Sequence, residues 1–558
     1  MNLGYLPISP WRVTLAFQEM CARSDKSFIR FPRSFSVYFW IVVVGSITRV
    51  LFLISLKPIW VPDSLSYTSA CALWATHFFT DGARTPLYPL LLGLAQTLAG
   101  VPAISSLNPI AGYIVIGFQC LFGLISSCLI FSTLEKLKIR RTIALTAAIG
   151  FSSCYSICLF EQVILTESMS TFAVVFLLWT VVSGVRNVLD GKQFRTQATL
   201  AGLAAGCAIL VRPDNLLVAL SGPALFAFCS LKFLLAHDGK IWAGRLGKAA
   251  LLITTCSIPF ALAWMTLNYV GVRQFRLTTS TGWQMSQAVY NIWDRVPPED
   301  LLVGEILSRS YARRAESNRG DRRDHFWLAF DELTTRSREL PLDNSRSKTR
   351  PAGLAGWIYS LPPESSRFYT HRYSAGAVMR PSTSVETPNS VGDYIGKVSW
   401  KLAKRNPEVW LHNAWTDFLF TFDFHPWMPS GNGVTAVPGG SVVRYPDLLT
   451  VAVLFGRIQA PVLTSLYVLT LLAALLAPVA LLRVTPESLA ACTVMVFASA
   501  TLATMAAYSL LAGYDQRYGV PHIAIMILCG SGGVELALRK SPKVRTHNSD
   551  HNSDLHEN

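Results

Sequence analysis

The sequence predicts an all-α polytopic membrane protein, and three observations lead to that fold class. First, 51% of the 558 residues are hydrophobic and the mean hydropathy is +0.36, which is too apolar for an ordinary soluble protein of this length. Second, the apolar residues are gathered in long runs. Third, the basic residues are concentrated in the short segments between those runs, as the orientation of membrane helices requires.

About ten apolar runs approach the ~20 residues that a membrane-spanning helix needs. The predicted spans are roughly 36–57, 108–132, 142–160, 166–185, 197–212, 214–236, 249–270, 459–482, 486–510 and 519–537. The fifth is short and is followed by a turn at Arg212-Pro213, so a re-entrant hairpin is the alternative for the fifth and sixth. The first run is long and comes after several basic residues, which indicates an uncleaved anchor.

The basic segments fix the predicted orientation. They follow the second, fourth, sixth and eighth spans and continue into the C-terminal tail, so all of them fall on the side of the N-terminus. By the positive-inside rule both termini are cytoplasmic, in a multi-pass plasma (inner) membrane protein. The predicted parts are a cytoplasmic segment 1–35, a transmembrane module 36–270 with a first external loop 58–107, a large external (periplasmic) region 271–446, C-terminal helices 447–537 and a cytoplasmic tail 538–558.

Composition argues against several other classes. The net charge of +15 is distributed as membrane topology requires, and no nucleic-acid-binding signature accompanies it, so we expect no nucleic-acid partner. Nearly all of the eleven cysteines lie inside apolar runs, and no Cys/His spacing is typical of a zinc site. We therefore expect neither a disulfide framework nor a dedicated cofactor. A divalent metal held by acids and a phosphate stays an open alternative.

Acidic residues collect on the predicted external side. Asp63 directly follows the first span, and Glu161 and Glu167 flank the start of the fourth. A carboxylate in such a position can act as a general base. The structural alternatives are that Asp63 caps the helix after it and that Glu167 is a favourable first-turn charge.

Arginines share that side. Arg84, Arg212 and Arg517 are candidates for binding a lipid phosphate, because a guanidinium is always charged and binds phosphate in bidentate fashion. The alternative is that they reach lipid headgroups or pair with Asp214 and Asp515.

Together these residues form a series of short motifs. They are Pro62-Asp63-Ser64-x-x-Tyr67, Arg84-Thr85-Pro86-Leu87-Tyr88-Pro89, Leu165-Thr166-Glu167-Ser168, Leu210-Val211-Arg212-Pro213-Asp214, Thr279-Ser280-Thr281-Gly282-Trp283-Gln284 and Gln516-Arg517-Tyr518-Gly519-Val520-Pro521. In order and sidedness the set resembles the GT-C glycosyltransferases, in the branch of protein O-mannosyltransferases and lipid A aminoarabinose transferases. The resemblance covers about residues 36–290 and 513–530.

In the first external loop, apolar residues at helical spacing within 64–79 predict an amphipathic helix in the membrane interface. A second interfacial helix is expected from Pro86, a good first-turn residue. The resemblance implies a GT-C-type bundle around this loop. It implies inverting transfer of a sugar from a polyprenyl-phosphate donor to a lipid, glycan or protein acceptor, on the outer face of the membrane. Asp63 would be the base, assisted by Glu167. The expected substrate-binding residues are Tyr67, Arg84, Tyr88, Glu161, Arg212, Arg517 and Tyr518.

The sequence departs from the family pattern in two places. Ser64 stands where the branch often has a second acid, and the Trp-Trp-Asp motif of oligosaccharyltransferases is absent. The main alternative function is a polytopic lipid or sugar transporter or flippase, which would require ionisable residues near the bilayer midplane and broken or repeated helices. A structural envelope subunit and a membrane acyltransferase are further alternatives. No His-Asp signature at a span boundary supports an acyltransferase, and His522 is interpreted as a packed residue.

Overall fold

The computed structural model describes most of the apolar part of the chain. The described residues are 33–61, 64, 67, 68, 70, 71, 84–101, 108–235, 240–272, 275–278, 281–317, 332, 333, 336, 340, 386–420, 443–485, 488–511 and 516–540. Asp63 lies outside them, and nothing is described of the side chains of Arg517 and Tyr518.

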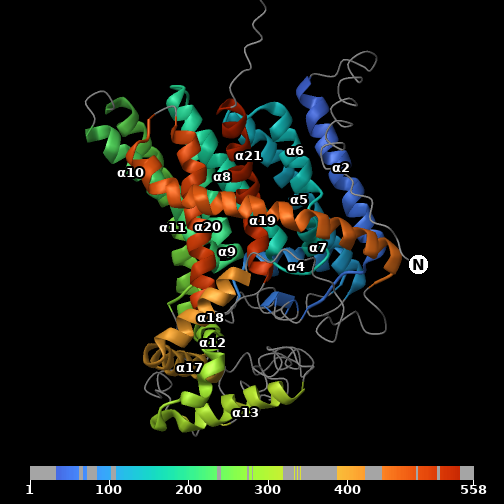
Figure 1. Ribbon diagram of the computed structural model, residues 1–558, viewed down its shortest axis with the longest axis vertical. Coiled ribbons are helices and arrows are strands. Elements are labelled where there is room, and N and C mark those ends of the chain that lie inside the picture. Colours follow the sequence, from blue (N-terminus) through green and yellow to red (C-terminus); the bar gives the residue numbers. More distant parts are fainter. Residues whose placement is uncertain are drawn as a thin grey trace, which may run out of the picture.

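The described residues form a helical bundle with a smaller helical unit at one end (Figure 1). The bundle helices are α2 (Arg33–Ser55), α4 (Leu87–Leu98), α5 (Pro109–Lys136), α6 (Arg141–Ser152), α7 (Tyr155–Glu161), α8 (Glu167–Leu189), α9 (Arg195–Val211), η2 (Pro213–Asn215), α10 (Leu216–Leu235), α11 (Lys240–Val272), α19 (Pro446–Leu482), α20 (Leu489–Leu511), η7 (Gln516–His522) and α21 (Ile523–Lys540). The remaining helices are α12 (Thr281–Ala288), η3 (Tyr290–Arg295), η4 (Pro298–Asp300), α13 (Leu301–Ser317), α17 (Glu386–Arg405) and α18 (Pro407–Phe420).

The predicted fold class of an all-α polytopic membrane protein is confirmed. Seven described helices are long and apolar enough to cross a membrane, or eight if α6 and α7, bent by 42°, form one span. The two remaining predicted spans correspond to shorter apolar helices, Arg195–Val211 and Gly519–Glu535. Among the described residues the β-structure is limited to two isolated bridges, Leu56 with Val443 and Ile59 with Val163.

Helix ends follow from local sequence. Pro109 occupies the first turn of α5, where its missing N–H costs nothing. The side chain of Asn108 accepts hydrogen bonds from the backbone N–H groups of Ile110 and Ala111 at 2.8 and 3.2 Å, which caps the helix. In the first external loop, α4 follows Pro86, where the sequence predicts a helix. Of the other predicted interfacial helix, residues 64, 67, 68, 70 and 71 are described, all of them helical.

The longest helix, α19, begins at Pro446 rather than near residue 459, where the sequence predicts a span. Its 37 residues extend for ~55 Å at 1.5 Å per residue, well beyond the ~30 Å hydrocarbon core of a bilayer. A helix of this length is accommodated by tilting. Figure 1 shows α19 crossing the bundle obliquely.

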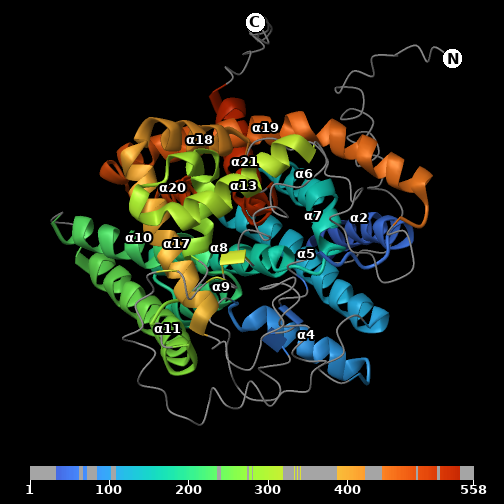
Figure 2. The same ribbon diagram turned by 90° about the horizontal axis from the view of Figure 1, so that it is seen from below.

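The smaller unit has a core of its own within the predicted external region. Its core contains Val289 and Trp293 before α13, Leu307 in α13, and Ile395 and Leu402 in α17. In Figure 1 this unit lies at the end of the bundle where α4 and α7 are found. Viewed from that end, α13, α17 and α18 lie together and α4 lies apart from them (Figure 2).

A polar contact also holds the smaller unit together. The side chain of Asp300 accepts hydrogen bonds from the Tyr394 hydroxyl and from Lys401 Nζ, the latter at 3.0 Å. Burial is the main cause that raises the pKa of Tyr394 above its ordinary value, and the hydrogen bond to Asp300 adds to it. Tyr394 therefore stays a neutral donor to the buried Asp300 carboxylate across the physiological range.

Candidate active site

The first external loop hydrogen-bonds directly to the segment that leads into the Leu165-Thr166-Glu167-Ser168 motif, which is called the second acidic motif below. Ile59 pairs with the segment before Glu167: its N–H donates to Gln162 O at 2.9 Å, and its carbonyl accepts from Ile164 N–H at 2.9 Å. Ser64 Oγ donates to Ile164 O at 2.7 Å. Ser64, the residue after Asp63 in the sequence, therefore fastens the start of the first external loop to the segment that leads to Glu167.

The predicted substrate-binding residues of the first loop contact one another. The Arg84 guanidinium carbon lies 4.5 Å from the centroid of the Tyr67 ring, and Arg84 Nη1 donates to the Tyr67 hydroxyl oxygen at 3.3 Å. The rings of Tyr67 and Tyr88 meet edge to face, with centroids 5.1 Å apart. Burial first, and then the nearby charge of Glu167, raise the pKa of Tyr88 well above its ordinary value. Tyr88 is therefore a neutral hydrogen-bond donor.

Gln119, within α5, connects these tyrosines to residues 161–167, which are called the acidic segment below. Its Oε1 accepts a hydrogen bond from the Tyr88 hydroxyl at 2.9 Å. Its Nε2 donates to Glu161 O at 2.8 Å and to Val163 O at 2.9 Å. Gln119 is completely buried, so one side-chain amide satisfies two backbone carbonyls and one hydroxyl that water does not reach. The sequence analysis missed Gln119, although an amide within an apolar span was the available signal.

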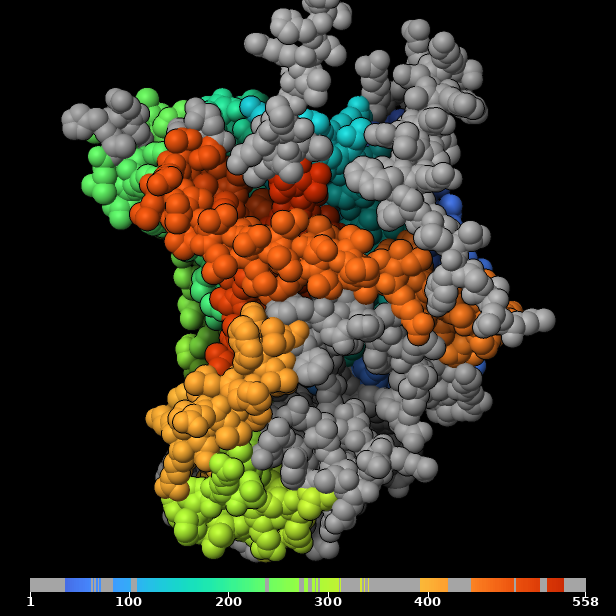
Figure 3. Space-filling model, viewed as in Figure 1, coloured from blue at the N-terminus to red at the C-terminus, as the bar shows by residue number. Residues whose placement is uncertain are grey.

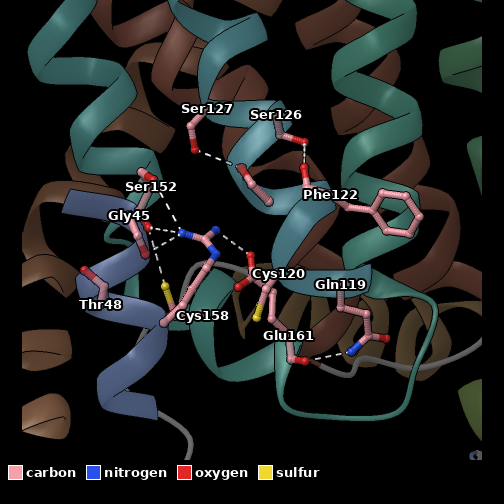
Figure 4. A network of polar contacts seen from close by, with 12 residues as sticks. Gly45, Thr48, Gln119, Cys120, Phe122, Ser126, Ser127, Ser152, Cys158 and Glu161 are labelled. Carbon is pink, nitrogen blue, oxygen red and sulfur yellow. Dashed lines mark hydrogen bonds and ion pairs between the residues drawn. The ribbon is translucent and has the colours of Figure 1, made fainter. Parts of the chain in front are cut away.

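Glu161, predicted as an external acid that binds substrate, is the last residue of α7 and is completely buried beside α2 and α5 (Figure 4). Arg49 Nη2 contacts Glu161 Oε1 at 2.6 Å, and Arg49 Nη1 donates to the carbonyls of Gly45 and Ser152 at 3.0 and 2.9 Å. Burying a lone carboxylate is costly, so Glu161 occurs with a cation. Within the described residues, Glu161 Oε2 and Arg49 Nε have no hydrogen-bond partner.

Arg49 is a second residue that the sequence analysis missed. An ionisable residue inside a predicted span is itself a signal, because such residues are rare unless they are paired. Gly123 leaves the room that the ion pair occupies. A Cβ on Gly123 would lie 1.8 Å from Glu161 Oε1 and 2.3 Å from Arg49 Nη2.

The motif at residues 210–214 contacts the second acidic motif through Arg212. Arg212 Nη1 lies 3.1 Å from Glu167 Oε1, and Arg212 Nη2 lies 2.9 Å from Asp214 Oδ2. Glu167 and Arg212 are both buried. Arg212 thus pairs with Asp214, which was the structural alternative, and also with the predicted catalytic acid. Thr85 Oγ1 donates to Val211 O at 2.9 Å, which fastens the first loop to this turn.

The late motif adjoins the same cluster. The 3-10 helix η7 packs against α8, which begins at Glu167. At the end of η7, His522 is buried, in agreement with its interpretation as a packed residue. The structure therefore brings together the described parts of five of the six motifs. Within the described ranges, no group of three or more His, Cys, Asp or Glu residues has an arrangement that would hold a metal ion.

Removing one partner of the buried Arg49–Glu161 pair should destabilise the protein strongly. In Arg49→Leu the Glu161 carboxylate would lose its cation, and breaking a buried pair in this way costs about 3–5 kcal/mol. The double variant Arg49→Leu/Glu161→Leu should lose less, because no uncompensated charge is left. The measurement is the free energy of unfolding in mixed micelles titrated with SDS.

Lys192→Leu is the matched control. Lys192 and Asp190 form an exposed pair with Nζ and Oδ2 3.1 Å apart, and exposed pairs contribute ~0–1 kcal/mol. If Arg49→Leu lowered the free energy of unfolding no more than Lys192→Leu does, the buried pair would not make the large contribution to stability predicted here.

Comparison with known proteins gives structural similarity alone. No family model and no curated protein matches the chain. A solved structure of the oligosaccharyltransferase AglB from Archaeoglobus fulgidus, in complex with an inhibitory peptide and a dolichol-phosphate, is 12% identical with a TM-score of 0.46 and covers 92% of this chain and 51% of its own. This chain thus spans about half the length of AglB.

Two further solved structures are similar. The S. cerevisiae protein O-mannosyltransferase Pmt1-Pmt2 complex bound to the sugar donor is 14% identical, with a TM-score of 0.34, and covers 44% of this chain and 34% of its own. ArnT from Cupriavidus metallidurans bound to undecaprenyl phosphate is 15% identical, with a TM-score of 0.31. The match covers 85% of this chain and 78% of the ArnT chain. All three are GT-C superfamily members, the superfamily that the motifs of this chain resemble. Because every TM-score is below 0.5, the proposal below rests on this chain's own motifs and contacts.

Proposed function

We propose that this protein is a membrane glycosyltransferase that transfers a sugar from a polyprenyl-phosphate donor to an acceptor. The acceptor nucleophile attacks the anomeric carbon, and Asp63 takes the nucleophile's proton. The bond between the anomeric carbon and the phosphate oxygen breaks, and polyprenyl phosphate leaves with the bonding electrons. A single displacement of this kind inverts the configuration at the anomeric carbon.

One observation carries the proposal: motifs far apart in the sequence are joined by direct contacts. Ser64 binds Ile164 across 100 residues, and Thr85 binds Val211 across 126 residues. Arg212 completes the set by pairing with Glu167. A site for a charged substrate requires several segments with ionisable or hydrogen-bonding side chains to lie close together. Helices that only anchor a protein in the membrane do not require such contacts.

The contacts separate the roles of the two described arginines. Arg212 pairs with Glu167 and Asp214, so in this proposal it positions Glu167 and does not meet the phosphate. Arg84 is partly exposed and lies over Tyr67, which leaves it suited to a phosphate oxygen. Arg517 and Tyr518 are proposed to bind the donor from the late motif, whose helix η7 packs on α8.

The direction of approach follows from the arrangement of the helices. The donor's lipid tail would reach Arg84 from the bilayer, beside α4. The acceptor would enter from the side of the α12, α13 and α17 unit, which lies at the same end of the bundle as α4 and α7 (Figure 1). With the positive-inside orientation, that end is the external face of the plasma membrane.

Asp63→Asn should abolish turnover while the protein still folds, because the amide does not accept the nucleophile's proton. The assay mixes purified protein with polyprenyl-phosphate sugars and a panel of acceptors, and it measures released polyprenyl phosphate. Asp190→Asn is the matched control, since Asp190 is an exposed carboxylate at the opposite end of α8 from Glu167. It should retain wild-type release.

The outcomes separate the candidate functions. A fully active Asp63→Asn protein would falsify the assignment of the base. Saturable binding of the donor lipid without release by the wild type, over the whole acceptor panel, would instead favour the transporter or flippase.

Gln119→Leu should lower kcat by tenfold or more and change KM for the donor much less. The variant leaves the carbonyls of Glu161 and Val163 without their side-chain donor, and each lost buried hydrogen bond costs about 1–3 kcal/mol. The acidic segment would then be positioned less accurately in the transition state. Because about 1.4 kcal/mol of activation free energy corresponds to a tenfold change in rate, a loss of this size gives the expected fall in kcat.

Gln459→Leu is the control for a purely structural effect. Gln459 also bridges helices through its amide, accepting from Tyr155 N–H at 2.8 Å and donating to Ser153 O at 3.0 Å, but it does not contact the acidic segment. If kcat fell equally in Gln119→Leu and Gln459→Leu while the folded fractions were equal, the proposal that Gln119 positions the acidic segment would be contradicted.

A further inference from the structure

Helix α18 (Pro407–Phe420) exposes an apolar stripe although it lies in the predicted external region. Leu411, Trp415 and Leu419 recur every four residues, so they share one face of the helix. They are 53%, 58% and 49% exposed. Three large apolar side chains in a row on a solvated helix need a partner that covers them.

The face of α18 next to this stripe is fastened to the membrane bundle, and the ring of Trp415 stacks on that of Phe418 with centroids 5.8 Å apart. Trp410 Nε1 donates to Leu510 O, in the last turn of α20, at 2.9 Å. Ala414 is buried, and Phe418 packs on a cluster formed by Tyr467 of α19, Met505 of α20 and Met526 of α21. Helix α18 therefore lies along the outside of spanning helices, at the end of the bundle next to the smaller unit (Figure 1).

The contact of Phe418 sets the depth of the C-terminal half of α18. Met505 precedes the end of α20 at Leu511 by six residues, which is ~9 Å along the helix axis. Because α20 has the length and composition of a membrane span, Met505, which is buried between helices, is expected at the depth of the hydrocarbon core. Trp415 and Leu419 flank Phe418 in the sequence and therefore lie at a similar depth.

The surface next to α18 is also apolar. Val468 and Leu472 of α19 follow Tyr467 and are 49% and 50% exposed. Figure 3 shows the gold residues of this region directly beneath the long orange α19. The stripe on α18 thus continues the lipid-facing surface of a spanning helix.

Charge changes along α18 in the same direction. Lys404, Arg405 and Glu408 are exposed at the junction with α17, and His412 is exposed one turn later. The exposed residues at 415 and 419 are apolar. Asp417, between them in the sequence, is partly buried and lies on the other side of the helix. An exposed face that begins among charges and ends among apolar side chains, with tryptophan between, has the pattern of a segment that enters a membrane interface.

We propose that the Leu411, Trp415 and Leu419 face of α18 is seated in lipid, in the leaflet on the side of the α12, α13 and α17 unit. The unit that follows the spanning helix α11 is then held to the bilayer at its C-terminal end as well. Lipid, rather than a second copy of the chain, is the occupant, because the stripe is continuous with the exposed apolar surface of α19 and reaches the depth of Met505.

Spin labelling in a bilayer tests this proposal. Trp415→Cys and Leu419→Cys, each in the full chain, are labelled with a nitroxide and reconstituted into nanodiscs of phosphatidylcholine and phosphatidylglycerol. Power-saturation EPR then compares collisions of the label with oxygen, which concentrates in lipid, and with a water-soluble nickel chelate. Glu408→Cys is the matched control on the same helix. The unsubstituted protein, treated alike, gives the background from the native cysteines.

The labels at 415 and 419 should show a ratio of oxygen to nickel collisions several-fold higher than the label at 408. Equal ratios at all three positions would place the stripe in water and overturn the proposal. Spin–spin broadening that grows when two chains share a nanodisc would assign the face to a second copy. Protection from both reagents would mean that protein covers it. Leu411→Cys repeats the measurement if Trp415→Cys does not fold.

Discussion

The turn between α7 and α8 is the constraint on which the rest of the site depends. Residues 162–166 are not helical, yet their exposed fractions lie between 0% and 3%. Irregular backbone at the end of a membrane bundle persists only where its polar groups are satisfied within the protein. Here the partners are the backbone of Ile59, the hydroxyl of Ser64 and the amide of Gln119. The groups that satisfy the turn are therefore the same ones that bring the first loop and Glu167 together.

Two buried ion pairs flank this turn and have different consequences. The Arg49–Glu161 pair lies among helices and fixes the end of α7, in space that Gly123 leaves open. The Arg212–Glu167 pair fixes the start of α8 and, through the turn after Val211, the position of Thr85. With both acids held by internal cations, Arg84 is the described arginine left partly exposed at the first loop. We therefore propose that Arg84 binds the phosphate and that Arg212 positions Glu167.

The sequence predicted the spans well because apolar length is a local property, and each of the ten predicted runs coincides with a described apolar helix. It also singled out the segments proposed to carry chemistry, since charged residues stand out against apolar runs. It did not predict partners: Glu161 was assigned no cation, and Arg49 and Gln119 were overlooked. Pairing depends on which helices adjoin, and residues 112 positions apart carry no local mark of their contact. The early start of α19 was missed for a different reason, because a tilted helix is longer than the bilayer is thick.

The central claim is that a lipid phosphate binds where the first loop meets the second acidic motif. The most direct measurement is photocrosslinking with a polyprenyl phosphate that carries a diazirine beside the phosphate, followed by peptide mapping by mass spectrometry. We expect labels within residues 84–98, suppressed by excess unlabelled polyprenyl phosphate. Labels confined to the exposed faces of α10 and α19, and unaffected by the competitor, would contradict it.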